Sequence, residues 1–257
     1  MKKGFMITGL VLLLTFAGSL LVTAATVEGD PFKGLELSIA YDFDFWPEDD
    51  DSLGTKDDKD IFFSDSAQAG ISLRFLATKE GAFKDRGKLE GLAFKHESIW
   101  EKGQAKNYVS FTLSQRHDMN LYAFDEFPEP KYFSFYIDTT NYKRNLDFYP
   151  IIYEQDYDEN EEEAGVSCMA IKAGSTFYLK NKEGVITSAK SYDQHIAIPK
   201  NFVGRVYLPL KDYVPIWGTQ DVNGKFDGLK VISYKFSFVD IGNKGEYIIF
   251  DEFAFLI

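Results

Sequence analysis

The chain has 257 residues, of which 45% are hydrophobic and 16% aromatic, and its formal net charge at pH 7 is −12. This hydrophobic content is enough to bury a sizeable core, which excludes a globally disordered chain. The negative charge repels phosphate backbones and anionic lipid headgroups, so nucleic acid is excluded as a partner, whereas neutral ligands and divalent cations are compatible with it.

Residues 1–25 predict a secretory signal peptide. Lys2 and Lys3 form a basic start, an apolar stretch follows up to Ala25, and small residues end that stretch. We expect cleavage near Ala24 or Ala25, which would give a secreted or cell-surface protein with no stable membrane insertion. An uncleaved anchor is the alternative, because the apolar stretch is nearly long enough to span a bilayer.

The first half of the remaining chain predicts short strands separated by charged loops. Apolar and polar residues alternate at several places, which is the period of a half-buried strand. Two segments rich in Asp and Glu, residues 46–60 and 156–163, predict solvated loops, because like charges at that density do not pack. The predicted strands are residues 34–44, 72–78, 89–99, 108–114, 131–139 and 146–154.

The second half continues in the same way. A hairpin is expected over residues 176–188, and residues 211–226 predict a long loop containing Pro, Gly and Trp217. Further strands are predicted at residues 194–198, 204–209, 229–239 and 246–257. Short, regularly spaced strands with hardly any helical periodicity predict an all-β fold. We expect an antiparallel β-sandwich (jelly roll) that forms a single domain over residues 26–257.

Parts of this pattern resemble a known family. Residues 202–210 (FVGRVYLPL), Trp217, the FSF of residues 236–238 and residues 247–253 (YIIFDEF) resemble the ending of galactose-binding-like β-jelly-rolls. These domains are common among the non-catalytic carbohydrate-binding modules of secreted bacterial proteins. Upstream, residues 41–44 (YDFD) and 132–138 (YFSFYID) resemble the opening and central strands of the same modules.

The resemblance implies sugar binding without catalysis and a structural calcium ion that ties the opening strand to the last one. Carried over by position, Asp42, Asp44 and Asp251 are the expected calcium ligands, since Ca²⁺ prefers oxygen ligands. The sequence departs from the family at Glu252, which replaces the second Asp of the closing motif, and at Tyr207, which stands downstream of the usual aromatic.

The residue types that support catalysis do not assemble into a recognisable site. The three His residues lack the spacing of a zinc helix, and no nucleophile elbow or phosphate-binding loop occurs. Cys168 is the single cysteine, so no intrachain disulfide is possible, and its apolar neighbours predict a small buried hydrophobe. The clustered carboxylates of the acidic loops are expected to be hydrated, whereas a glycosidase needs two that face each other.

A polysaccharide or oligosaccharide is the expected partner. Sugar recognition combines flat aromatic faces with polar groups that bond to hydroxyls, and Tyr provides both. The segment 153–157 offers both chemistries, so the predicted ligand-binding residues are Tyr153, Gln155, Asp156 and Tyr157, together with Trp217. Trp46, Trp100 and Tyr192 are further aromatic candidates. The alternative is a loop plug over the core for Trp217 and core packing beside Ile99 for Trp100.

Two other functions compete with sugar binding. A secreted polysaccharide hydrolase or lyase can be built on a jelly-roll scaffold, and it would need carboxylates such as Asp156 or Asp158 in a cleft. An envelope-associated structural or protein-binding module would instead use the sandwich as a scaffold, with the acidic loops serving solubility.

Overall fold

The computed structural model of the chain describes residues 25–41, 61–65, 71–77, 92–98, 109–115, 122–123, 130–157, 163–216, 230–238 and 246–257. Within these ranges the chain forms seventeen strands and one short 3-10 helix. None of the helical structure there is long and apolar enough to cross a membrane. The all-β prediction is confirmed, while residues 1–24 of the predicted signal peptide lie outside the described ranges.

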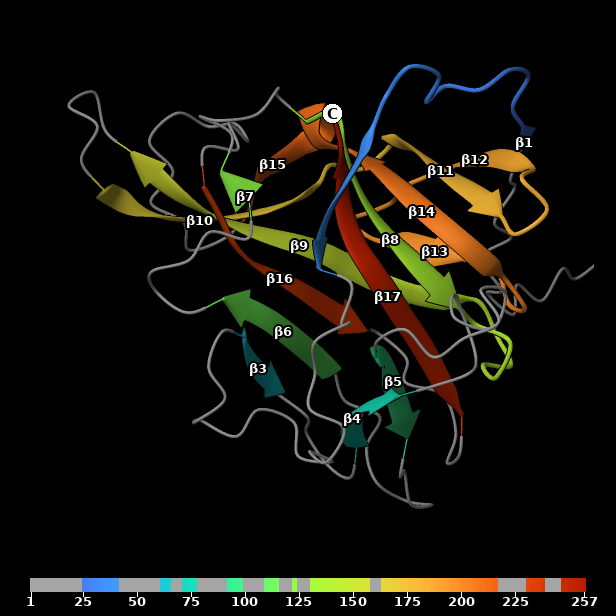
Figure 1. Cartoon of the computed structure of the whole chain (residues 1–257), viewed down its shortest axis with the longest axis horizontal. Helices are drawn as coiled ribbons and strands as arrows, with labels where there is room; N and C mark the ends of the chain where they lie inside the picture. The colour runs from blue at the N-terminus through green and yellow to red at the C-terminus, as the bar shows by residue number, and fades with distance from the viewer. Residues whose placement is uncertain are drawn as a thin grey trace, which may run out of the picture.

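The strands form two antiparallel sheets (Figure 1). Sheet A contains β1 (Ala25–Thr26), β12 (Ile186–Lys190), β11 (Thr176–Asn181), β14 (Val203–Pro209), β8 (Tyr132–Asp138), β17 (Tyr247–Leu256), β5 (Leu92–Ser98) and β4 (Ile71–Ala77) in that order, with β2 (Leu37–Tyr41) also on β17. Sheet B contains β15 (Tyr213–Pro215), β10 (Glu163–Ile171), β9 (Leu146–Tyr157), β16 (Lys230–Phe238), β6 (Val109–Gln115) and β3 (Ile61–Asp65), with β13 (Ile196–Ile198) on β9 and β7 (Tyr122–Ala123) on β16. The 3-10 helix η1 (Leu210–Asp212) links β14 to β15.

Aromatic side chains from both sheets fill the space between them. Phe135 of β8 lies with its ring centroid 4.9 Å from that of Phe236 of β16, and Phe133 stacks on Tyr234 at 4.8 Å. All four side chains are fully buried. Each buried side chain of this size contributes about 1.5–3 kcal/mol of hydrophobic free energy. The alternation that predicted strands in the sequence is therefore the alternation between this core and the outer faces.

The chain passes repeatedly from one sheet to the other. After β8 in sheet A come β9 and β10 in sheet B, β11 and β12 in sheet A, β13 in sheet B and β14 in sheet A. The chain then enters sheet B for β15 and β16 and closes with β17 in sheet A. This is the connectivity of an antiparallel jelly-roll sandwich, and it confirms the predicted fold class.

The structure corrects the predicted loops and strands at several places. The acidic loop of residues 156–163 is shorter than expected, because β9 continues to Tyr157 and β10 begins at Glu163. β15 lies inside the predicted long loop, and no strand was predicted for β1, β3, β7 or most of β10. In the β9–β10 hairpin the charged strand ends pair through backbone hydrogen bonds, which need no apolar side chains, so the alternation of the sequence does not reveal them.

The outer face of sheet A is partly covered by the N-terminal segment. Phe32 stacks on Tyr207 with ring centroids 3.9 Å apart and meets Tyr132 and Tyr178 edge-on. The four rings belong to a small cluster separate from the main core. The tyrosines of β8, β11 and β14 at this end of the sheet are thus occupied by packing within the chain, which directs attention to the outer face of sheet B.

Candidate functional site

The outer face of sheet B carries two half-buried tyrosines on one strand. Tyr149 and Tyr153 of β9 pack against a cluster that contains Ile151 of the same strand and Cys168 of β10. Residues four apart on a strand point to the same face, about 13 Å apart along it. We call Tyr149, Ile151 and Tyr153 the tyrosine face.

Neighbouring strands place further side chains beside the tyrosine face. On β16, Lys235 pairs with Ile151, between the two tyrosines, and Ser237, which is fully buried, pairs with Tyr149. On β10, Cys168 pairs with Tyr153. Burial raises the pKa of the Cys168 thiol, while a side-chain hydrogen bond from Tyr153 and the charge of Lys235 lower it. Cys168 is buried and free, which confirms the prediction of a small buried hydrophobe.

A second group of side chains adjoins the tyrosine face at Tyr149. Asp147 of β9 accepts a hydrogen bond from the Tyr192 hydroxyl with one carboxylate oxygen, and its other oxygen lies 2.9 Å from His195 Nδ1. Because a carboxylate only accepts hydrogen bonds, Nδ1 carries the hydrogen in this pair. The His195 ring packs against Tyr149, with centroids 3.5 Å apart. We call Asp147, Tyr192 and His195 the Asp147 cluster.

The buried tyrosines predict how the free energy of unfolding changes at alkaline pH. Burial raises the pKa of Tyr213 well above the ordinary value of 10.0, and burial together with the hydrogen bond to Asp147 raises the pKa of Tyr192. Above pH 10 the unfolded chain loses these protons while the folded chain keeps them. The free energy of unfolding is therefore expected to be insensitive to these groups below that pH and to fall above it.

Tyr213→Phe tests this expectation, because it keeps the buried ring and removes one titrating group. Each such group contributes a slope of up to about 1.4 kcal/mol per pH unit. Urea unfolding at several pH values from about 9 to about 11.5 should show that the free energy of unfolding falls less steeply with pH in the variant than in the wild type. Two parallel curves would contradict the assignment.

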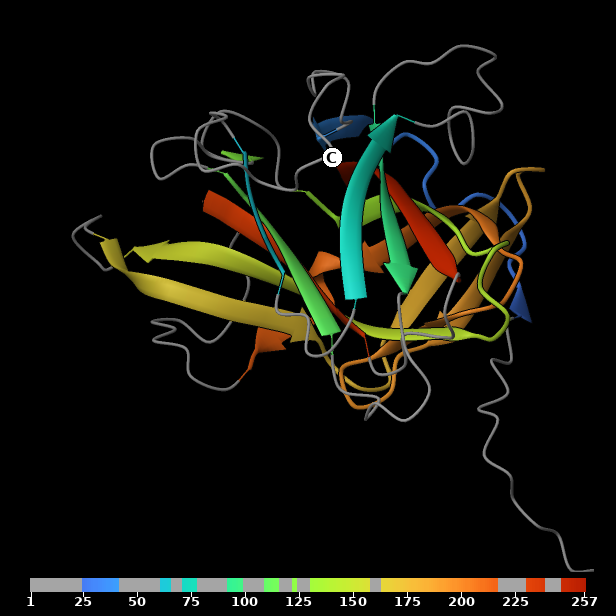
Figure 2. The same ribbon diagram turned by 90° about the horizontal axis from the view of Figure 1, so that it is seen from below.

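Of the predicted ligand-binding residues, the structure puts Tyr153 on the tyrosine face and the other described ones elsewhere on β9. Gln155, Asp156 and Tyr157 belong to the last part of β9 and pair with β10, beyond the described pairing of β9 with β16. This end of the β9–β10 hairpin projects from the sandwich (Figure 2). Trp217 lies outside the described residues, directly after Ile216, which packs against Cys168. Asp156 is thus a strand residue, which corrects its predicted loop position.

Only one of the three predicted calcium ligands, Asp251, lies within the described residues. Asp42 and Asp44 lie outside them, and no group of three His, Cys, Asp or Glu suited to a metal occurs within them. Asp251 is fully buried in β17, where its carboxylate accepts a 2.8 Å hydrogen bond from the backbone N–H of Glu252. Calcium binding stays a prediction.

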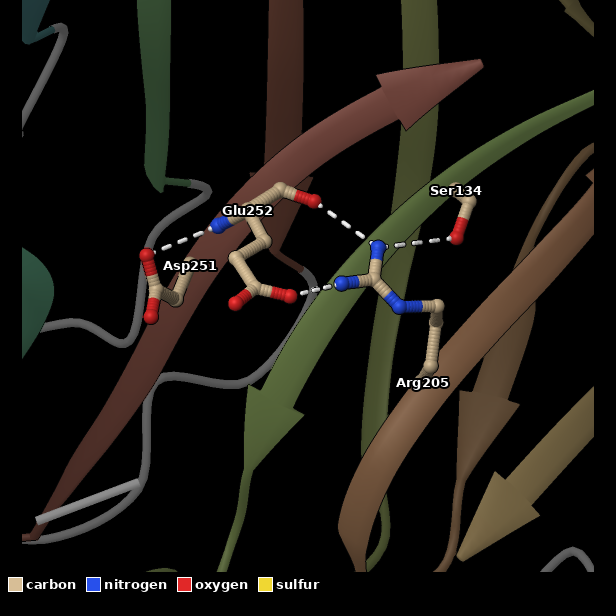
Figure 3. Close-up of polar contacts among 4 residues, drawn as sticks. All are labelled: Ser134, Arg205, Asp251 and Glu252. Carbon is tan, nitrogen blue, oxygen red and sulfur yellow. Dashed lines mark hydrogen bonds and ion pairs between the residues drawn. The ribbon is translucent and has the colours of Figure 1, made fainter. Parts of the chain in front are cut away.

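β17 has a β-bulge between Asp251 and Ala254. Asp251 pairs with Tyr136 of β8 but Ala254 pairs with Ser134, so β17 holds one extra residue here, and Glu252 has φ +46°. Arg205 of β14 closes the bulge (Figure 3). Its guanidinium donates to the Glu252 side chain, to the Glu252 carbonyl oxygen at 3.0 Å and to Ser134 Oγ at 3.2 Å. This buried ion pair is a structural clamp between strands, and sequence reasoning did not identify it.

Sequence reasoning also missed Tyr149, Asp147 and His195 as parts of one site. Tyr149 could have been found, because it stands four residues before Tyr153 in the same alternating segment. The contacts of Asp147 join residues 45 and 48 positions apart, and no local pattern announces them. Tyr192 was an aromatic candidate, and the structure places it beside His195.

No family model matches the sequence, and no curated protein matches it. Among solved structures, it is similar to the family 11 carbohydrate-binding module of Clostridium thermocellum in complex with a β-1,3-1,4-mixed-linked tetrasaccharide (13% identity, 80% of this chain and 92% of that chain, TM-score 0.42). It is likewise similar to the family 11 module of the cellulosomal cellulase Lic26A-Cel5E of Clostridium thermocellum, at 12% identity over 86% of this chain and 94% of that chain, with a TM-score of 0.40.

Proposed function

We propose that the chain is an exported, non-catalytic carbohydrate-binding protein that holds its ligand on the tyrosine face. The observation that carries the proposal is the pair of half-buried tyrosines, Tyr149 and Tyr153, on one face of β9 with polar groups at their side. Export is proposed from the N-terminal pattern of a basic start, an apolar stretch and small residues.

The chemistry of the face suits a sugar chain. A tyrosine ring offers an apolar surface to the C–H side of a pyranose and keeps a polar hydroxyl for its oxygens. Two rings about 13 Å apart along a strand can contact separate residues of an oligosaccharide. The Lys235 side chain and the Asp147 cluster supply charged and polar groups beside these rings, as binding sites commonly combine apolar surfaces with a few oriented polar groups.

The charge of the chain narrows the ligand class. At −12 the protein repels polyanions, so a neutral polysaccharide is the expected ligand. Sulfated or uronate-rich chains are expected to bind more weakly at low ionic strength. Calcium is retained as a structural ion in the proposal, on the grounds of Asp42, Asp44 and Asp251 in the sequence motif.

Binding to immobilised neutral polysaccharides, followed by calorimetry with oligosaccharides, tests the proposal. Tyr149→Ala and Tyr153→Ala are each expected to weaken binding by about 2 kcal/mol, a factor of roughly thirty, as truncation of a central aromatic anchor does. Tyr153→Phe keeps the ring and is expected to retain most of the affinity.

Tyr136→Ala is the matched control, because Tyr136 is also a half-buried tyrosine but belongs to β8 in sheet A. Thermal melting of each variant separates loss of binding from loss of fold. Binding lost in Tyr136→Ala and kept in Tyr149→Ala would move the site to the other sheet. A wild-type protein that retains no polysaccharide, with or without calcium, would remove the proposal altogether.

A further inference from the structure

The turn that carries the Asp147 cluster has an unusual backbone. Tyr192 and His195 form an isolated antiparallel bridge, with backbone hydrogen bonds of 3.0 Å from Tyr192 N–H to His195 and 2.6 Å in return. The two residues between them both have positive φ, +40° at Asp193 and +67° at Gln194. Two central residues with positive φ characterise a type I′ turn, for which Asn-Gly and Asp-Gly are favoured sequences.

Gln194 is not a residue that this backbone prefers, because it stands where Gly is favoured, whereas Asp193 is a favoured residue at the first central position. Left-handed backbone is accessible to glycine without steric cost, whereas side chains with a Cβ are strained in it. Gln194 in particular gains no help of the kind that Asn and Asp derive from their short polar side chains. Strained residues of this kind persist where the surroundings hold them in place, and they concentrate at ligand-binding sites.

Side chains around the turn hold it in place. Both residues that flank the turn are anchored to one carboxylate, since Asp147 accepts a hydrogen bond from the Tyr192 hydroxyl and another from His195 Nδ1. His195 is buried, and its ring packs on Tyr149 and stacks with Tyr192. Asp193 contributes to the raised pKa of Tyr192, which places its charge close to this cluster. The turn is therefore fixed relative to Tyr149.

The residues that this anchoring presents are polar and accessible. Asp193 is exposed and Gln194 is half-buried, while their two neighbours provide the attachment. A carboxylate accepts hydrogen bonds and an amide both donates and accepts them, so together they can satisfy adjacent sugar hydroxyls, each of which does both. A fixed turn binds with less loss of conformational entropy than a mobile one.

We infer that the Tyr192–His195 turn selects the ligand of the tyrosine face, with Asp193 and Gln194 bonding to the hydroxyls of a neutral sugar residue seated on Tyr149. The inference rests on the proposed function and names its specificity-determining residues. The Asp193 carboxylate favours uncharged hexose units and repels uronic acids, because like charges at close range oppose binding. Asp147 is a positioning residue that acts through Tyr192 and His195.

The double substitution Asp193→Asn with Gln194→Gly separates the role of the side chains from that of the backbone. It installs the preferred type I′ sequence, so the variant should melt at the same temperature as the wild type or higher. Its affinity for the polysaccharide that the wild type binds best should fall at least about tenfold. The single variant Asp193→Asn changes only the charge of an exposed side chain, and it should narrow the preference for neutral over uronate-containing polysaccharide by about threefold or more.

The outcomes can be told apart. If the wild type binds, Tyr149→Ala weakens binding, and the double variant binds within about twofold of the wild type, the turn does not select the ligand and the inference fails alone. If the double variant does not fold, Asp193→Asn decides in its place, and an unchanged preference overturns the inference. If the wild type binds no polysaccharide, the proposed function is wrong, and the inference, which rests on it, is wrong as well.

Discussion

Gly204→Ala is expected to prevent the chain from reaching its native sandwich. Gly204 lies in β14 between Asn181 of β11 and Ile137 of β8. A Cβ at this position would stand 2.8 Å from Asn181 Cα and 3.0 Å from the Lys180 carbonyl carbon, and closer still to the Lys180 carbonyl oxygen. All three are backbone atoms of a paired strand, which cannot rotate away as a side chain can.

The cost of Gly204→Ala should exceed about 4 kcal/mol, a range reached only by disruptive substitutions. Since single domains are stable by only about 5–15 kcal/mol, most molecules would be unfolded or misassembled. Circular dichroism, together with urea unfolding of whatever soluble protein is obtained, measures this directly.

Gly184→Ala is the matched control. Gly184 also has positive φ, +83°, but a Cβ there would meet nothing within 4 Å. Its substitution is expected to cost only the backbone strain, about 1–2 kcal/mol. If Gly204→Ala were as mild as Gly184→Ala, the close approach of β11 to β14 would not be the reason for glycine at this position.

The second large effect is expected at the buried ion pair. Arg205→Met removes the cation that faces Glu252 and leaves that carboxylate buried at the β17 bulge. Breaking one partner of a buried pair typically destabilises a protein by about 3–5 kcal/mol. The loss should appear as a lower urea midpoint with an unchanged slope, because the fold itself is retained.

Arg205→Met combined with Glu252→Gln tests the electrostatic part of this cost, since it removes both charges and keeps the shape of the acid. The double variant is expected to recover much of the stability lost in the single one. Lys180→Met provides a control on the same sheet, where the cation pairs with Asp30 at 3.9 Å and is partly exposed. That pair should be worth less than about 1 kcal/mol. Equal losses in Arg205→Met and Lys180→Met would refute the clamp.

The fold class was accessible from the sequence for a local reason. Residues 132–138 and 230–238 alternate between apolar and polar side chains, and each stretch became a strand whose apolar side faces the core. Gly204 belongs to the motif of residues 202–210 but was not singled out in it. The reason for glycine at this position is the close approach of the β11 backbone, which depends on strand order and not on neighbours in the chain.

Only part of the candidate site could be predicted from the sequence. Tyr153 could be predicted as a candidate because an aromatic beside polar residues is visible in one segment. The Asp147 cluster and the Arg205–Glu252 pair were not found, since each joins residues more than forty positions apart. The end of β9 was placed in a loop because its charge masked a hairpin that is held by backbone hydrogen bonds.

By itself, the sequence determined that this is an antiparallel β-sandwich with an aromatic core, because the period of apolar residues is a property of each strand alone. Only the tertiary structure decided which tyrosines share an outer face, which carboxylate holds the Tyr192–His195 turn, and where a buried arginine meets its acid. Those features depend on register and strand order, which are set by pairings between distant segments.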